Sequence, residues 1–230
     1  MKRFLFFVFL FLFVTALSAQ NVQLHYDAGK DRGYLTSTVE MFKPDKYGST
    51  FFFVDMDYSS VPGIKGVTLA YWEIARALKF WDAPVAFHTE YNGGFGQWSS
   101  VMVKGAYQIN DAFLNGLEYA WNAADFSRGL TLQAMHKYIR GKHDFAFQLT
   151  GVWYLHLLDQ KVSFTGFADF WREDNVFGKN TTKFVFLSEP QLWYNFNPHF
   201  SAGGEIEFSS NFGGWEGFRV CPTLAVKYTF

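Results

Sequence analysis

The chain ends in the stretch FRVCPTLAVKYTF, Phe218–Phe230, in which two kinds of residue alternate. Every even-numbered residue from Phe218 to Phe230 is apolar or aromatic, while Arg219 and Lys227 lie among the odd-numbered ones. A period of two gives a β-strand one apolar face and one polar face. The stretch also has the ~9 to 11 residues that a tilted strand needs to cross a bilayer. It therefore predicts the closing strand of an outer-membrane β-barrel.

The aromatic end of this strand adds to the prediction. A two-faced strand also occurs in soluble sandwiches and lipocalins, so alternation alone favours a membrane barrel only slightly. Bacterial barrel proteins commonly end in an aromatic residue that resembles the signal read by the outer-membrane assembly machinery. We therefore predict that Tyr228 and Phe230 form an assembly signal and that this machinery is a partner of the chain.

The first residues of the chain have the composition of a secretory signal peptide. Lys2 and Arg3 precede an apolar run from Phe4 to Leu17, and the small residue Ala19 stands at the expected cleavage point. The alternative is an uncleaved membrane anchor, which needs ~20 apolar residues, more than this run has. The sequence thus predicts a cleaved signal peptide at residues 1–19 and one barrel domain at residues 20–230.

The composition is typical of a protein in which only alternate residues face lipid. The chain is 49% hydrophobic and 21% aromatic, yet its mean hydropathy is −0.04. A formal net charge of −1 offers no basic surface for nucleic acid. The single cysteine, Cys221, cannot form an intramolecular disulfide. We expect an all-β, antiparallel transmembrane barrel in contact with the lipid of a Gram-negative outer membrane.

Counting the alternating runs gives the number of strands. The runs are residues 21–28, 34–42, 49–58, 67–80, 85–92, 99–109, 112–121, 129–139, 144–157, 162–171, 182–195, 199–210 and 218–230. Bacterial single-chain barrels have an even number of strands, short periplasmic turns and longer external loops. Short periplasmic turns and long external loops can be assigned from the N-terminus and, separately, from the C-terminus. The two assignments agree only if residues 92–111 form one external loop. We therefore predict about 12 strands, with residues 99–109 an external excursion or an infolded lid, and a bulge near Arg76.

Several segments resemble a known family of channels. They are 71–73 (YWE), 166–171 (GFADFW), 188–193 (SEPQLW), 204–207 (GEIE) and 227–230 (KYTF). These segments resemble those of the Tsx-like nucleoside-specific channel proteins and of a related uncharacterised family from Bacteroides-type bacteria. The resemblance covers most of the mature chain and is strongest from Gly166 onward. It implies a narrow 12-stranded channel whose lumen carries aromatic and ionisable residues that bind nucleosides as they pass.

The alternation also predicts which residues face the lumen. If Phe230 faces lipid, the opposite face of each strand points inward, and an Arg or Lys at the lipid midplane would cost ~2 to 4 kcal/mol. Ionisable residues with this inward position are Asp55, Asp57, Glu73, His88, Glu90, Glu118, Asp169, Glu189, Glu205, Glu207, Arg219 and Lys227. Aromatic residues with the same position are Phe53, Phe167, Trp171 and Trp193. Acids outnumber bases in this set.

A barrel of this size lies between the filled 8-stranded kind and the open porins, so its bore suits a nucleoside. Inward aromatic rings could stack on a base, at ~1 to 3 kcal/mol each, while carboxylates accept hydrogen bonds from sugar hydroxyls. We predict passive, selective diffusion of nucleosides or similar small polar solutes. The predicted solute-binding residues are Phe53, Asp55, Asp57, Glu73, Glu90, Phe167, Asp169, Trp171, Glu189, Trp193, Glu205, Glu207 and Arg219.

Three alternatives stay open at this point. The inward charges could be structural ion pairs, for example Arg219 with Glu205 or Glu207, and the aromatic rings could plug the barrel. The protein could be a non-conducting anchor or adhesin. It could also be a lipid-modifying barrel enzyme, but the six histidines lack metal-ligand spacing and nothing marks an activated serine. We therefore predict no enzymatic activity, no metal site and no cofactor.

Overall fold

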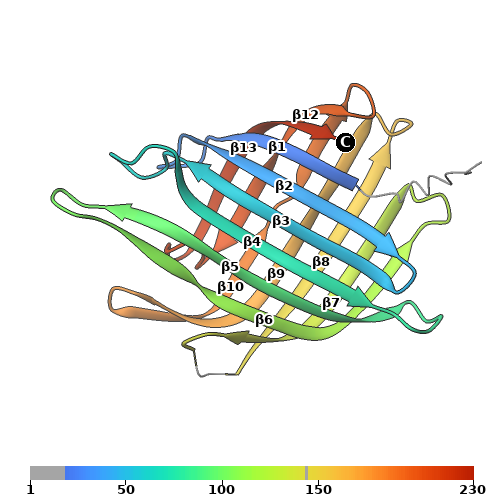
Figure 1. Cartoon of the computed structure of the whole chain (residues 1–230), viewed down its shortest axis with the longest axis horizontal. Helices are drawn as coiled ribbons and strands as arrows, with labels where there is room; N and C mark the ends of the chain where they lie inside the picture. The colour runs from blue at the N-terminus through green and yellow to red at the C-terminus, as the bar shows by residue number, and fades with distance from the viewer. Residues whose placement is uncertain (1–18, 143–144) are drawn as a thin grey trace, which may run out of the picture.

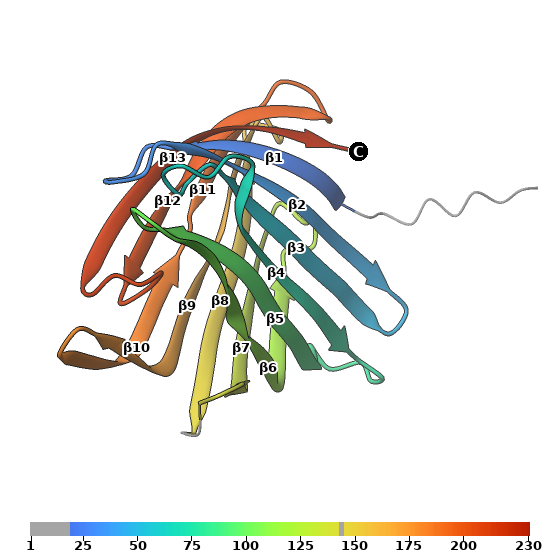
Figure 2. The same cartoon turned by 60° about the vertical axis from the view of Figure 1, so that its left-hand side comes forward.

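The barrel is a single antiparallel sheet that closes on itself (Figures 1 and 2). The computed structural model describes residues 19–142 and 145–230. The last strand, β13 (Phe218–Thr229), pairs with the first, β1 (Ala19–Asp27), and this pairing closes the sheet. The predicted fold class and the closing role of β13 are therefore confirmed. The predicted signal peptide lies almost wholly outside the described residues and stays a prediction.

The strands follow one another around the wall in chain order. Between β1 and β13 they are β2 (Tyr34–Asp45), β3 (Gly48–Tyr58), β4 (Val67–Leu78), β5 (Val85–Ser99), β6 (Lys104–Asn122), β7 (Arg128–Ile139), β8 (Ala146–Leu157), β9 (Val162–Phe177), β10 (Asn180–Ser188), β11 (Gln191–Asn195) and β12 (Phe200–Ser210). Each pairs with its neighbours in the sequence, except that β10 and β11 share a place between β9 and β12.

β10 and β11 are two halves of one barrel strand. Ser188 pairs with Ala168 and Gln191 pairs with Thr165, so both halves keep the same register on β9. Pro190 interrupts the ladder because proline has no N–H to donate. The barrel thus has twelve strand positions, as predicted.

The segment predicted as an external loop is the outer part of a long hairpin. β5 and β6 stay paired from Gly94 with Ile109 to Ser99 with Lys104. In Figure 1 this hairpin projects beyond the neighbouring strands, so it is an external excursion and not an infolded lid. The predicted bulge near Arg76 is wrong, because Arg76 pairs regularly with Thr50 and the register of β3 on β4 shifts beside Asp57 instead.

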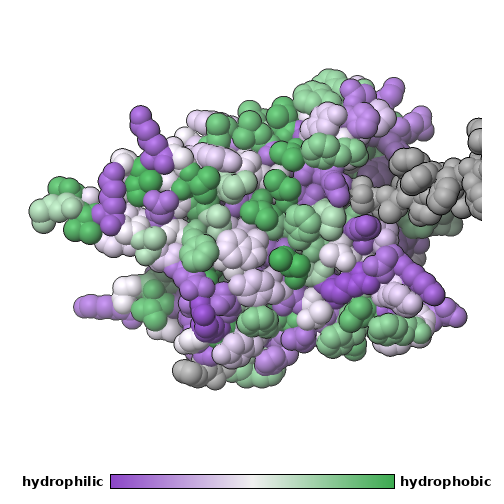
Figure 3. Space-filling model, viewed as in Figure 1, coloured by the Kyte–Doolittle hydropathy of each residue, from purple (hydrophilic) through white to green (hydrophobic). Residues whose placement is uncertain are grey.

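Exposure alternates along the strands as the sequence predicts. On β13, Phe218 and Leu224 are 65% and 73% exposed, whereas Cys221 and Ala225 are 0% and 8% exposed. Figure 3 shows apolar side chains spread over the outer face of the strands. An apolar exterior over a closed sheet is what a lipid bilayer requires of a β-structure. In residues 19–142 and 145–230, no helix is long and apolar enough to cross a membrane.

The turns differ between the two ends of the barrel. The C-terminus and the β2–β3 and β4–β5 turns lie at one end, and the β5–β6 hairpin lies at the other (Figure 1). In the short β6–β7 turn, the backbone N–H and the hydroxyl of Ser127 both donate to the Asp125 carboxylate and lower the pKa of Asp125. Short turns mark the periplasmic end of such barrels, so the hairpin end is external.

We predict that Phe230→Ala impairs assembly and leaves the assembled barrel largely unchanged. The Phe230 side chain is 69% exposed, so little packing is lost, while its backbone N–H still bonds to the Gln20 carbonyl at 3.0 Å. The yield of heat-modifiable, membrane-inserted protein measures assembly, and the conductance of the inserted fraction measures the channel. Phe218→Ala, at the other end of the same strand, is the matched control. A normal yield for Phe230→Ala would contradict the prediction.

Candidate functional site

The pairing of the strands places the predicted solute-binding residues on the inner face of the barrel. Cross-strand pairs join Asp55 to Tyr71, Phe53 to Glu73, and Glu73 to Asn92. On the far wall the register groups Asp169, Phe167 and Trp171 with Glu189, Trp193, Glu205 and Glu207. The inner face also holds buried polar residues, which are Asn21, Gln23, His25, Asp27, His88, Asn92, Gln148, Ser201 and Ser209. The lumen is therefore lined mainly by polar side chains.

Five carboxylates form an acid belt across the middle of the lumen. They belong to Asp55 on β3, Glu73 on β4, Glu90 on β5, Asp169 on β9 and Glu189 between β10 and β11. In a barrel of twelve positions, β3 and β9 lie on opposite sides. Glu189 nevertheless interacts electrostatically with Asp55 as well as Asp169, and Glu73 interacts with Asp169. The belt thus spans the bore.

Hydrogen bonds fix part of the acid belt and leave part of it free. The Tyr71 hydroxyl and the Asn92 amide both donate to Glu73 Oε1, at 2.7 and 3.0 Å. Thr38 donates to Asp55. Within the described part of the chain, the Glu189 carboxylate has no side-chain hydrogen bond or ion pair. Its lone pairs therefore stay available to a solute or to water.

His88 links the acid belt to a further carboxylate. Its Nδ1 lies 2.9 Å from Glu118 Oε2, and its Nε2 lies 3.1 Å from Glu90 Oε2. Gln133 also donates to Glu118 Oε2, at 3.0 Å. An imidazolium donates from both ring nitrogens, so a protonated His88 would form an ion pair with each of the two carboxylates.

Lys137 brings a positive charge to the acid belt. Its Nζ donates to Gln148 Oε1 at 2.7 Å and interacts electrostatically with Glu73 and Asp169. Lys137 was not among the residues predicted to face the lumen, although alternation along β7 places it on the same face as Gln133. Inner polar partners such as Tyr71 and Gln148 were missed as well, and the same two-residue period would have found them.

The two inward tryptophans are part of the wall and are not open to the bore. Trp193 is 0% exposed, and the Lys227 ammonium lies 4.1 Å from its ring centroid, with His25 at its edge. Trp171 is 7% exposed, and the Lys137 ammonium lies 4.4 Å from its ring centroid. An ammonium over an aromatic face is a stabilising cation–π contact. In this arrangement neither ring offers a free face to a solute.

Phe212 also contacts Trp171, although it comes from the β12–β13 loop. The two rings meet edge to face, with centroids 6.0 Å apart. Asn175 on β9 donates to the carbonyl of Asn211, which fixes the start of this loop. The loop therefore reaches from β12 across β10 to residues of β9.

Phe53 and Phe167 keep accessible surface on the inner face, since both are only half-buried. Phe53 pairs with Glu73, and the carbonyl of Phe167 accepts the backbone N–H of Glu189. Each ring thus lies beside a carboxylate of the acid belt. These two aromatic–carboxylate pairs face one another from opposite walls.

The suggested pairing of Arg219 with Glu205 or Glu207 is wrong. Glu207 pairs instead with Arg32 from the β1–β2 loop, at 2.9 Å, and Arg32 also bonds to Asp27 at 2.7 Å. Arg219 lies over the Trp215 ring at 4.0 Å. Glu205 accepts a hydrogen bond from Gln191, and Asp57 accepts one from Thr36. Arg219, Glu207 and Asp57 thus belong to the external mouth and not to the acid belt.

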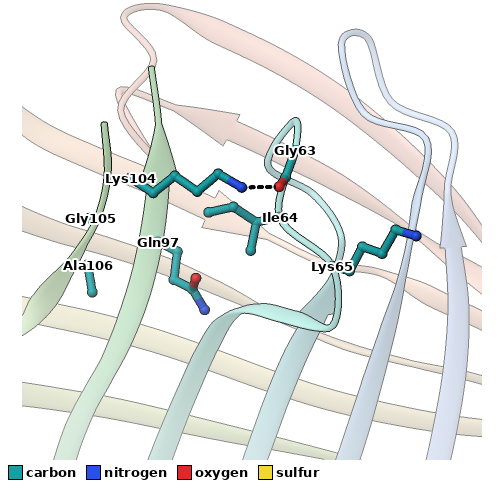
Figure 4. Close-up of a pocket in the computed structure, with 7 residues that line it drawn as sticks. All are labelled: Gly63, Ile64, Lys65, Gln97, Lys104, Gly105 and Ala106. Carbon is teal, nitrogen blue, oxygen red and sulfur yellow. Dashed lines mark hydrogen bonds between the residues drawn. The ribbon is translucent and has the colours of Figure 1, made fainter. Parts of the chain in front are cut away.

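Two hollows lie outside the lumen. One, of about 380 Å³, lies between the β3–β4 loop and the β5–β6 hairpin, where Lys104 donates to the carbonyl of Gly63 (Figure 4). The other, of about 640 Å³, is an apolar groove on the lipid-facing side over Ala134, Gly151 and Ala168. Among the described residues, no three or more His, Cys, Asp or Glu side chains are grouped to hold a metal ion.

Solved structures with a similar fold are outer-membrane barrels. The NanC porin is 11% identical, with a TM-score of 0.58, and the match covers 92% of this chain and all of that one. The KdgM porin is 12% identical, with a TM-score of 0.49, over 92% of this chain and 99% of that one. Omp33 of Acinetobacter baumannii is 14% identical, with a TM-score of 0.44, over 93% and 97%. At these identities the likeness concerns the fold alone.

Together with its apolar exterior, this fold is that of an outer-membrane β-barrel, as predicted. No curated protein matches the chain. The resemblance to Tsx-like channels stays a prediction. A family model described as a domain of unknown function, DUF5020, matches residues 19–230. The chain therefore belongs to the DUF5020 family.

Proposed function

We propose that this barrel is a channel for passive, selective diffusion of nucleosides or similar small polar solutes that carry no net negative charge. The acid belt is the observation that carries the proposal. Its five carboxylates cross the bore, and Lys137 interacts with three of them, Glu73, Glu90 and Asp169. A narrow passage in which carboxylates outnumber ammonium groups favours neutral and cationic solutes and repels anions.

The two aromatic–carboxylate pairs suit the two parts of a nucleoside. A base is flat and can stack on Phe53 or Phe167, while ribose hydroxyls can donate to Glu73 or Glu189 beside them. Because Trp171 and Trp193 are covered by lysines, we assign the stacking to the phenylalanines. Two weak binding sites on opposite walls let the channel discriminate among solutes without binding any of them too tightly to be released. Passive diffusion requires both properties.

Uptake into proteoliposomes tests the proposal. We expect adenosine to enter faster than adenosine monophosphate, because the phosphate meets the acid belt. Liposomes that contain no protein give the background for each solute. Equal rates for the two solutes, or no uptake above background, would contradict the proposed function.

A non-conducting adhesin or anchor is the second candidate. The tip of the β5–β6 hairpin favours it, because Val101 and Met102 are almost fully exposed on the external side. Exposed apolar tips of this kind mark contact surfaces. Single-channel recordings separate the candidates, because an adhesin with a closed lumen gives no discrete conductance in a planar bilayer.

A further inference from the structure

The inner face of the β5–β6 hairpin carries two flat aromatic rings outside the barrel wall. Beyond Gly93 the strands pair Gly96 with Tyr107 and Trp98 with Gly105, so each ring stands opposite a glycine. A Cβ added to Gly96 would clash with the Tyr107 ring, and one added to Gly105 would lie 2.7 Å from the Trp98 ring. The rings therefore lie directly on the backbone of the opposite strand.

Each ring has one covered face and one free face. Gly96 is buried beneath Tyr107, yet Tyr107 is 46% exposed and Trp98 is 44% exposed. Covering strand glycines with aromatic rings stabilises a hairpin, and this accounts for the inner faces of the rings. Covering the glycines does not involve the outer faces of the two rings, which are exposed and can contact a ligand.

Register places these rings on the same face as the lumen lining. Gly94 pairs with Tyr71, whose hydroxyl bonds to Glu73 of the acid belt, and Gly96 pairs with Leu69 on the same side of β4. The inner face of the hairpin is thus the continuation of the lumen wall past the external mouth. A solute that approaches from outside meets Trp98 and Tyr107 before it meets the acid belt.

The one charged residue of the hairpin beyond Gly93, Lys104, and the polar Gln97 point the other way. Figure 4 shows Lys104 reaching toward the β3–β4 loop, where its ammonium bonds to the Gly63 carbonyl. Gln97 donates to the Val67 carbonyl on the same outer side. The inner face therefore offers aromatic surface without an ammonium beside it, in contrast to the lumenal Trp171 and Trp193.

We propose that Trp98 and Tyr107 form a stacking ledge that captures the planar base of a nucleoside before it enters the lumen. This inference rests on the proposed function for its ligand, since the acid belt beyond the ledge favours uncharged solutes. Stacking on aromatic side chains is tolerant of base identity. Rings already held flat lose little conformational freedom when the base arrives. The ledge would raise uptake at low solute concentration and would matter little at saturation.

Fluorine NMR of the folded, 5-fluorotryptophan-labelled barrel in detergent tests the ledge. W98F identifies the Trp98 resonance among those of the eight tryptophans. Titration with adenosine should shift the Trp98 signal saturably and leave that of buried Trp193 in place. Y107A should weaken the binding about tenfold, whereas F95A, which removes an aromatic ring from the outer face of the same hairpin, should not.

The outcomes separate this inference from the proposed function. A Trp98 signal that adenosine does not shift, or that a neutral saccharide shifts instead, overturns the ledge even if adenosine uptake is fast. A saturable shift without uptake supports the ledge and contradicts the channel. If Y107A and F95A bind adenosine as wild type does, the rings serve only to cover the glycines, and the ledge is again overturned. Unchanged heat-modifiability of each variant shows that the barrel has folded.

Discussion

Leu132→Arg is expected to destabilise the inserted barrel by about 2 to 4 kcal/mol, the cost of a guanidinium near the bilayer midplane. Leu132 lies near the middle of β7, and its side chain is 49% exposed on the lipid-facing side. Urea unfolding in lipid vesicles, followed by tryptophan fluorescence, measures the free energy of unfolding. A large drop in the midpoint, or failure to insert at all, is the expected result.

Thr131→Arg is the matched control for this substitution. Thr131 is the preceding residue on β7 and points into the lumen, where Gln133 and Glu118 lie nearby. An arginine there meets water and carboxylates, so the free energy of unfolding should change by less than about 1 kcal/mol. Equal destabilisation by the two variants would contradict the assignment of inner and outer faces on β7.

The faces and the number of strands could be predicted because both depend on local rules. A period of two sorts side chains by face wherever the backbone is extended, and lipid makes the difference between the faces large. Phe218 and Cys221, three residues apart on β13, show the resulting contrast in exposure. Because such barrels have an even number of strands, the run at residues 99–109 was not counted among the predicted barrel strands.

The partners within the lumen could not be predicted in the same way. Arg32 reaches Glu207 because the β1–β2 loop folds over the mouth, and alternation says nothing about loops. Whether Lys137 covers Trp171 depends on the rotamers of both side chains. The hairpin beyond Gly93 was predicted to be an external loop because the turns assigned from the two ends of the chain agree only in that way. Its glycines make room for rings from the facing strand.

Glu189→Lys is expected to reverse the charge preference of the channel and to admit adenosine monophosphate. The substitution removes one carboxylate from the acid belt and adds one ammonium at the same place. One charge pair at ~4 Å is worth about 1 kcal/mol even in water and more at lower dielectric, so the ratio of cation to anion permeability should fall roughly tenfold or more. Reversal potentials in a salt gradient measure this ratio.

Stability should not fall with this substitution, because the Glu189 carboxylate has no side-chain partner to lose within the described residues and sits near the carboxylates of Asp55 and Asp169. Glu189→Gln, which removes the charge and keeps the shape, should give an intermediate permeability ratio. Glu216→Lys makes the same charge change in the β12–β13 loop, where Glu216 bonds to Asn180, and should leave the ratio near that of wild type. If Glu216→Lys and Glu189→Lys shift the reversal potential equally, selectivity arises from the external surface, and the acid belt is not the filter.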